Sequence, residues 1–192
     1  MRICRHDGKV FPYMQSKQLV IFTDIGDTVI DEATEYRKPG SLVVESASCI
    51  PGAKETMLQL YREGFTIAMV ADGLAQSFHN SMTQNGLDGI FSARVISELV
   101  HCHKPGKRMF AEAMGRVGLN DADKKRVIMV GNDVTRDVGG ANAYGIRSVH
   151  LDWSDRHRCI PEYPMEEATY TIHTPSELYD LCHRLERELQ AE

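Results

Sequence analysis

Short apolar runs that end in acidic, polar or glycine residues recur along the chain. The first run is residues 19–23, which stops at Asp24, and similar runs lie at 66–70, 92–96 and 127–130. Runs of this length that are rich in β-branched residues are typical of strands buried on both faces of a parallel sheet. Because ligands bind beyond the carboxyl ends of such strands, the pattern predicts one site assembled from several strand ends.

Segments with helical periodicity alternate with these strands. Apolar residues repeat at helical spacing after Gly52, at 76–84, at 107–117, near 136–144 and, with Pro175 at the first helical position, through the C-terminal segment. Two further strands are expected at 147–151 and 169–172. This alternation predicts an α/β fold: a three-layer, doubly wound, Rossmann-like parallel sheet with helices on both faces. We expect a single domain over residues 1–192, with its core at 19–185.

Two segments leave alternatives open. Residues 1–17 precede the core, and Asp7-Gly8 is a favoured two-residue turn, so this part is either a small hairpin over residues 2–13 or a loose arm. Residues 29–50 hold two apolar patches on either side of Lys38-Pro39-Gly40-Ser41. They predict a second hairpin or flap near the site, with an irregular loop as the alternative.

Composition narrows the classes of function. A formal charge of −5 without a basic cluster argues against binding to nucleic acid. The five cysteines are odd in number and widely spaced, which favours reduced thiols and a cytoplasmic protein. The sequence holds no apolar stretch of membrane-spanning length, so we expect no membrane association.

Four short motifs lie at predicted strand ends or in the loop between them. In chain order they are residues 22–28 (Phe-Thr-Asp-Ile-Gly-Asp-Thr), residues 70–73 (Val-Ala-Asp-Gly), Lys104-Pro105, and residues 130–137 (Val-Gly-Asn-Asp-Val-Thr-Arg-Asp). Together, and in this order, they resemble the four motifs of the haloacid dehalogenase superfamily. The resemblance spans residues 19 to 185 and implies the same α/β core.

The resemblance implies phosphoryl transfer through a covalent intermediate. Asp24 would attack phosphorus and form an aspartyl phosphate. Mg²⁺ prefers oxygen ligands, and Asp24, the carbonyl of Gly26 and a side chain of the fourth motif, Asn132 or Asp133, would supply them. The expected function is therefore that of an Mg²⁺-dependent phosphohydrolase.

The other expected roles concern charge and phosphate binding. Lys104 would neutralise the phosphate and hold Asp24 ionised, and Asp137 would orient Lys104 or a metal-bound water. Thr28 would place its hydroxyl on a phosphate oxygen or fix the turn. The second motif, residues 71–73 (Ala71, Asp72 and Gly73), would complete the phosphate-binding loop.

Each role has an ordinary structural alternative. An aspartate at a strand end is commonly a turn former or helix N-cap, and Asp133 and Asp137 both stand where a helix is expected to begin. A lysine before proline is commonly a surface residue in extended chain. Residues 156–158 (Arg-His-Arg) are either an anion-binding loop or solvated charge.

The chain departs from the family pattern at three positions. Gly26 stands where family phosphatases carry a second Asp as general acid and base, Ala71 where a hydroxyl residue is usual, and Asn132 where an Asp is usual. A lost general acid costs on the order of 10² to 10⁴ in rate, and most for alkyl phosphates, whose leaving groups need a proton. Whether Asp27 or Asp133 replaces the missing carboxylates is left open by the sequence.

The spacing of the motifs bears on the substrate. About 38 residues separate Thr28 from the second strand and about 30 lie between Ala71 and Lys104, too few for an inserted cap domain. The open site this implies suits accessible or activated phosphoesters, either small molecules or phosphoproteins, or a homo-oligomer whose partner closes the site. The alternative is a catalytically weakened family member that binds a phosphorylated ligand or protein partner.

Overall fold

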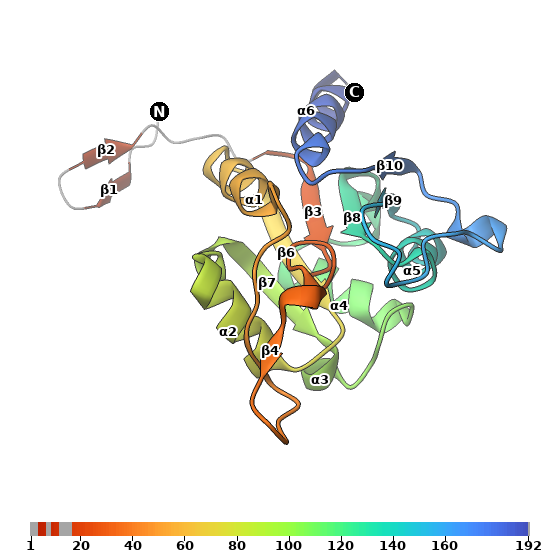
Figure 1. Cartoon of the computed structure of the whole chain (residues 1–192). Helices are drawn as coiled ribbons and strands as arrows, with labels where there is room; N and C mark the ends of the chain where they lie inside the picture. The colour runs from red at the N-terminus through yellow and green to blue at the C-terminus, as the bar shows by residue number, and fades with distance from the viewer. Residues whose placement is uncertain (1–3, 7–8, 12–16, 192) are drawn as a thin grey trace.

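The computed structural model describes residues 4–6, 9–11 and 17–191 (Figure 1). Its centre is a six-stranded, all-parallel sheet with the strand order β10-β9-β8-β3-β6-β7. The strands are β3 (Val20–Thr23), β6 (Thr66–Ala71), β7 (Phe91–Ile96), β8 (Val127–Gly131), β9 (Arg147–Leu151) and β10 (Tyr170–Ile172). The order reverses at β3, which lies between β8 and β6, so the expected doubly wound α/β fold is confirmed.

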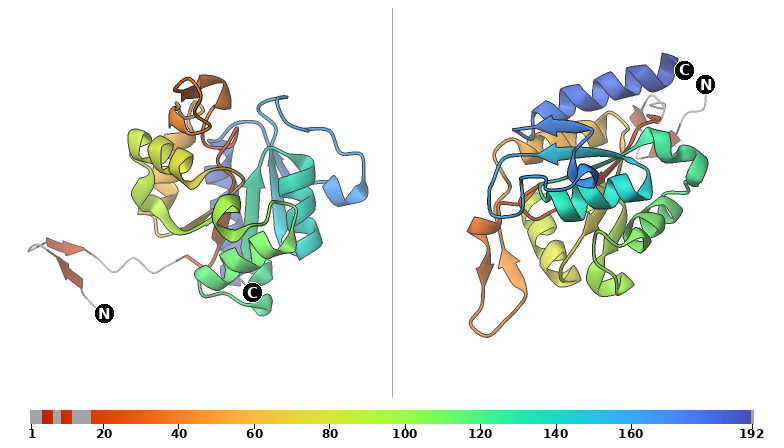
Figure 2. Two further views of the ribbon diagram at one scale, coloured as in Figure 1. Left: turned by 90° about the horizontal axis from the view of Figure 1, so that it is seen from below. Right: turned by 90° about the vertical axis from the view of Figure 1, so that its right-hand side faces the viewer.

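Helices cover both faces of this sheet (Figures 1 and 2). Apolar residues of α1 (Ala53–Arg62), α2 (Ala75–Asn85) and α6 (Glu177–Ala191) belong to the core on one face. Those of α3 (Ser97–Val100), α4 (Lys107–Arg116) and α5 (Gly140–Tyr144) belong to the core on the other. The result is the three-layer architecture that the alternation of strands and helices predicts.

Strand β3 illustrates why the central strands read as continuous apolar runs. Ile21 packs into the core on the α1 and α6 side, whereas Val20 and Phe22 pack into the core on the α4 side. All three side chains are at most 2% exposed. Since successive side chains of a strand point to opposite faces, a strand covered on both sides needs apolar residues at every position.

A two-stranded hairpin follows the first motif, and we call residues 36–46 the flap (Figure 2). It pairs β4 (Tyr36–Arg37) with β5 (Val44–Ser46) in antiparallel register, which confirms the expected hairpin. The flap is tied to α2 because the amide of Val44 donates to Ser77 Oγ and Asn80 Nδ2 donates to the Val44 carbonyl. Within residues 17–191, no domain is inserted either here or between β6 and β7.

Local structure differs from the sequence-based expectations in two helices. Residues 134–139 form a π-helical turn that leads into α5, so the segment expected as one helix near 136–144 begins earlier and in another geometry. The reason is Asp133, whose side chain accepts from the amides of Thr135 and Arg136 and starts the turn at Val134. The C-terminal helix α6 begins at Glu177 rather than at Pro175.

The N-terminal segment contains a pair of short strands. Strand β1 (Cys4–His6) pairs with β2 (Lys9–Phe11) in antiparallel register. The Asp7-Gly8 turn expected between them lies outside the described residues. Among the helices that the structure describes, none is both long and apolar enough to cross a bilayer.

Candidate active site

Asp24 is placed at the carboxyl end of the central strand. The Asp24 amide donates to the Val130 carbonyl at 2.9 Å, which extends the pairing of β3 with β8 by one residue. The side chain emerges at the edge where β3, β6 and β8 all end, and its Oδ1 lies 2.6 Å from Nζ of Lys104. The aspartate expected to be the nucleophile is therefore paired with the lysine of the third motif, which comes from the loop between α3 and α4.

Lys104 is shared between two carboxylates. Its Nζ also lies 2.7 Å from Oδ1 of Asp137, and both Lys104 and Asp137 are nearly completely buried. Burial alone would lower the pKa of Lys104, but the charges of Asp137, Asp24 and Asp72 outweigh it and raise that pKa. One ammonium beside two close carboxylates leaves a net negative charge in the site, which favours a further cation.

The same imbalance acts on Asp137. Burial raises the pKa of Asp137 to about 6 and the nearby Asp24 adds to the rise, while Lys104 opposes it. The other carboxylate oxygen, Oδ2, accepts from the amide of Asp133 at 3.1 Å. Asp137 thus connects Lys104 to the backbone of the fourth motif and fixes the direction of the lysine.

Asn132 and Asp133 of the fourth motif have different surroundings. Asn132 is fully buried, and neither of its side-chain polar atoms has a hydrogen-bond partner among the described residues. Asp133 caps the turn that follows, and its Oδ2 accepts from Nε of Arg136 at 2.8 Å. Buried polar groups are normally paired, so the unpaired amide of Asn132 is the freer of the two for a ligand.

The second motif contributes its aspartate and glycine, but not its alanine, to the pocket. Asp72 accepts from the amide of Lys104 at 3.1 Å and lies 4.0 Å from the guanidinium of Arg136. Gly73 needs to lack a side chain, since a Cβ there would lie 2.9 Å from the ring of Phe78. Ala71 is instead completely buried in the apolar core.

Thr28 is separated from the carboxylates. It is buried and lines a small interior cavity with Val29, Ala53 and Leu178, and its hydroxyl has no hydrogen-bond partner among the described residues. Its amide donates to the carbonyl of Ile25 at 3.3 Å. Of its two expected roles, the one supported by this position is fixing the turn.

A pocket of about 210 Å³ opens beside Asp24. Asp24, Asp72 and Arg136 line its base, Leu42 and Val44 line it from the flap, and Phe78 lines it from α2. The guanidinium of Arg136 would attract an anionic group to the side of the nucleophile. The mixed polar and apolar walls would contact whatever that group is attached to.

Asp27 lies outside this pocket and is tightly paired. It is fully buried in a left-handed turn with φ of 46°. Arg156 binds both of its oxygens, with Nε to Oδ2 and a terminal nitrogen to Oδ1 each at 2.7 Å, and a terminal nitrogen also reaches Asp31 at 2.6 Å. The pKa of Arg156 is raised, chiefly by its hydrogen bond to Asp27. Asp27 is therefore a structural partner of Arg156.

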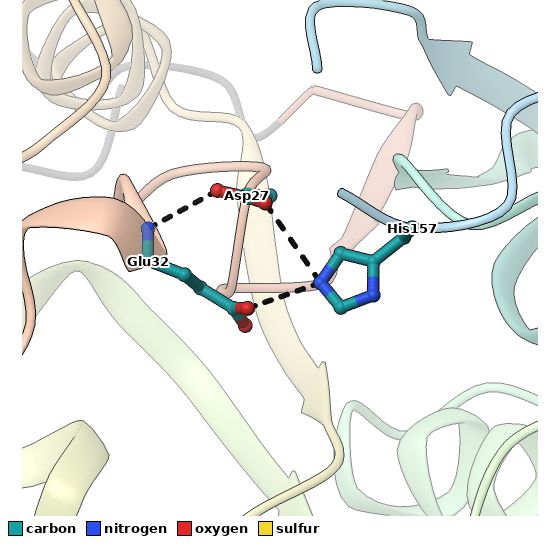
Figure 3. A group of neighbouring side chains, drawn as sticks. All are labelled: Asp27, Glu32 and His157. Carbon is teal, nitrogen blue, oxygen red and sulfur yellow. Dashed lines mark hydrogen bonds and ion pairs between the residues drawn. The ribbon is translucent and has the colours of Figure 1, made fainter. Parts of the chain in front are cut away.

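Residues 156–158 connect the fourth motif to the segment just before the flap, residues 27–35, which we call the flap base. Next to Arg156, Nε2 of His157 lies 3.0 Å from the Glu32 carboxylate (Figure 3). On the other side of the ring, Nδ1 lies 3.1 Å from the guanidinium of Arg136. Arg158 donates to Oγ1 of Thr135. All three side chains bind groups of the protein itself, which accounts for this basic run without an external anion.

Asp27, Glu32 and His157 come close enough together to raise the question of a metal ion (Figure 3). Their potential ligand atoms lie within 4.8 Å of one another. However, both oxygens of Asp27 are bound by the guanidinium of Arg156, and a divalent cation there would be repelled by that charge. The cluster is better described as part of the contact between residues 156–158 and the base of the flap.

The sequence analysis gives no role in the site to Glu32 or Arg136, and it considers His157 only as part of an anion-binding or solvated run. All three lie on loops or turns, where no periodic pattern indicates which way a side chain points. Gly26 is the one signal in the sequence, because the absence of a carboxylate at this position suggests that another acidic residue nearby replaces it.

Comparison with known proteins places this geometry in a family. Residues 10–151 match the family described as haloacid dehalogenase-like hydrolase. The chain is 28% identical over 138 residues to the glyceraldehyde 3-phosphate phosphatase of Methanopyrus kandleri, covering 72% of this chain and 58% of the relative. It is 25% identical over 134 residues to the (S)-2-haloacid dehalogenase 4A of Burkholderia cepacia, covering 70% and 55%.

A solved structure gives the same fold. The HAD-hydrolase YfnB of Bacillus subtilis, bound to magnesium in its crystal structure, superposes with a TM-score of 0.62 and 23% identity, covering 70% of this chain and 56% of YfnB. The chain spans little more than half the length of these relatives. The motifs, the fold and the match over residues 10–151 together show that the chain belongs to the haloacid dehalogenase-like hydrolase family.

Proposed function

We propose that this hydrolase is an Mg²⁺-dependent phosphatase that works through an aspartyl phosphate at Asp24. The observation that carries the proposal is that Nζ of Lys104 lies within 2.7 Å of a carboxylate oxygen of Asp24 and of one of Asp137 at the carboxyl edge of the sheet. Asp24 attacks phosphorus, Lys104 balances the phosphate charge, and Asp137 holds Lys104 in place. The phosphatase named among the relatives supports this reaction class.

The residues beside Asp24 fit a hard divalent cation. Asn132 offers a fully buried amide oxygen without a partner, and Asp24 and the Gly26 carbonyl complete a set of oxygen ligands. Asp133 has both of its oxygens in hydrogen bonds, so the proposed set relies on Asn132. When bound, Mg²⁺ would neutralise the phosphate and the excess carboxylate charge, which a single lysine leaves uncompensated.

The dimensions of the pocket support a small phosphoester as the substrate. About 210 Å³ would hold a phosphoryl group and a short carbon chain. The flap forms one part of its wall and would cover one side of the substrate without a cap domain. A phosphoprotein side chain would also fit, whereas no further subunit is needed to complete the pocket. The four cysteines within residues 17–191 are free thiols, which supports a cytoplasmic location as part of the proposal.

The test is hydrolysis of an aryl phosphate and of an acyl phosphate with and without Mg²⁺, in the natural protein and in Asp24→Asn. We expect turnover that requires Mg²⁺ and is lost in the variant, because the amide of asparagine is not a nucleophile. Full activity of Asp24→Asn would contradict the proposal. Binding of phosphorylated ligands without any turnover by the natural protein would favour the alternative of a catalytically weakened binding protein.

A second candidate function is displacement of halide from a haloacid. It is favoured by the neutral residues Gly26 and Asn132, because attack by Asp24 on carbon expels halide and needs no proton donor. A dehalogenase also stands among the relatives. Halide release from a 2-haloacid that equals or exceeds phosphate release from phosphoesters would favour this second function.

A further inference from the structure

The space next to Gly26 is filled by the side chain of Glu32. A Cβ at residue 26 would collide with Oε1 of Glu32 and would lie 2.9 Å from its Cδ. The carboxylate of Glu32 therefore occupies the volume that an aspartate side chain at position 26 would need. Glu32, from the flap base, thus fills the position where family phosphatases carry the second Asp of the first motif.

Glu32 faces the same pocket as the nucleophile. It begins η1 (Glu32–Thr34), a 3-10 turn at the base of the flap, and it lines the pocket together with Asp24, Gly26 and Arg136. Its side chain is 35% exposed, so it is accessible to a ligand in the pocket. A carboxylate in this position can reach a group bound against Asp24.

Glu32 is held in place through both its backbone and its side chain. The backbone amide of Glu32 donates to Oδ1 of Asp27 at 3.1 Å, which anchors the start of the turn. On the side-chain end, Nε2 of His157 lies 3.0 Å from Oε2 (Figure 3). The hydrogen bonds within residues 17–191 account for Oε2 but not for Oε1, the oxygen next to Gly26. Oε1 is thus left for the substrate.

We propose that Glu32 is the general acid and base of the reaction, in place of a carboxylate at position 26. The inference rests on the proposed phosphatase function. As Asp24 forms its bond to phosphorus and the bond from phosphorus to the leaving oxygen breaks, Glu32 gives its proton to that oxygen. In the second step Glu32 takes a proton from water, the water oxygen bonds to phosphorus, and the bond from phosphorus to Asp24 breaks.

The obvious rival for this role is Asp27, the acidic residue next to Gly26. Both of its oxygens are bound by Arg156, it is fully buried, and it does not line the pocket. A proton on Asp27 would break its pairing with Arg156 and could not reach the substrate. Asp27 instead supports Glu32 through the hydrogen bond from the Glu32 amide.

The first experiment compares leaving groups in Glu32→Gln. A general acid matters most when the leaving oxygen is basic, so we expect an alkyl phosphate to lose about 10²- to 10⁴-fold in kcat/KM, which reports the step in which Asp24 is phosphorylated. An aryl phosphate, whose leaving group needs little protonation in that step, should lose less than tenfold in kcat/KM. Equal losses of kcat/KM for the two substrates, or no loss for either, would overturn the proposal. The aryl activity also reports whether the variant is folded.

The second experiment removes the carboxylate at residue 32 and introduces one at residue 26. Glu32→Ala should lose alkyl phosphatase activity, and adding Gly26→Asp to that variant should restore at least a tenth of it, because the space at position 26 is then free. Gly26→Asp alone should be impaired by the collision with Glu32. A double variant no better than Glu32→Ala would overturn the proposal. The matched control is Glu45→Gln on the flap, outside the pocket, which should retain full activity.

The two proposals fail in different ways. If Asp24→Asn keeps its activity, the proposed function fails whatever Glu32 does. If Asp24→Asn is inactive while Glu32→Gln shows no dependence on the leaving group, only the assignment of Glu32 fails.

Discussion

Nζ of Lys104 lies 2.6 Å from Oδ1 of Asp24, joining the third motif to the first in a buried ion pair. The pair does not stand alone, because the same ammonium lies 2.7 Å from Asp137. The charge state of the site therefore depends on one lysine that two carboxylates share.

Removing Lys104 should damage both stability and activity. Lys104→Met leaves two buried carboxylates without their cation, and we expect a loss of about 3–5 kcal/mol in the free energy of unfolding. The loss of a charge aimed at the phosphate should lower kcat by about 10²- to 10³-fold. Urea unfolding and steady-state kinetics measure the two effects. Lys107→Met, an exposed lysine nearby, is the control, and wild-type kcat in Lys104→Met would contradict the account.

Two glycine-to-alanine substitutions should act in opposite directions. A Cβ at Gly131 would lie 2.5 Å from Cβ of Asp137 and closer still to its carboxylate, so Gly131→Ala must push Asp137 away from Lys104. We expect at least a tenfold loss of activity. Gly115 lies within α4 with open space around it, and Gly115→Ala should raise stability by up to about 0.5–1 kcal/mol. Thermal unfolding and activity of the two variants, measured side by side, check both.

The pairing of Arg156 with Asp27 should be visible in a double-mutant cycle. Arg156→Met leaves the fully buried Asp27 without its main partner. The arginine side chain is itself 38% exposed, so we expect a modest cost of about 1–3 kcal/mol. Adding Asp27→Asn removes the unpaired charge and should recover part of this loss. Costs that simply add in the double variant would show that the two side chains are not coupled.

Glu166 should make stability depend on pH in the acid range. Hydrogen bonds, first from the amide of Glu162 and then from Thr135 and Tyr163, lower the pKa of Glu166 in the folded state. Its contribution is therefore fully present above the ordinary glutamate pKa of about 4.3 and is lost as the pH falls through the lower folded-state value. The difference in unfolding free energy between the natural protein and Glu166→Gln should shrink below pH 4. The control is Glu188→Gln on α6, which should show no such pH dependence. A difference in unfolding free energy that grows as the pH falls would contradict the prediction.

The sequence predicts the fold well because the central strands are buried on both faces. Each such strand is a continuous apolar run with a sharp polar end, and β9 is found over the predicted residues 147–151. The segment after β8 begins at Val134 and not near residue 136 as predicted, because the cap by Asp133 depends on side-chain hydrogen bonds that no periodicity reveals. Boundaries set by such contacts are known only from coordinates.

The site is predictable where the motifs mark it and not elsewhere. The motifs single out Asp24, Lys104 and Asp137, and the structure places both carboxylates within 2.7 Å of Nζ of Lys104. Glu32 and His157 lie far apart in sequence and meet only because the flap base and residues 156–158 fold against each other. Their meeting is a tertiary contact between irregular segments, for which the sequence offers no pattern.

The most direct test of the central claim is to identify the residue that carries the phosphoryl group. The protein is mixed with an aryl phosphate and Mg²⁺, quenched rapidly in acid, digested and examined by mass spectrometry. We expect phosphate on the peptide that contains Asp24, and none in Asp24→Asn. Turnover at the full rate by Asp24→Asn, or phosphate found on another residue, would contradict the account.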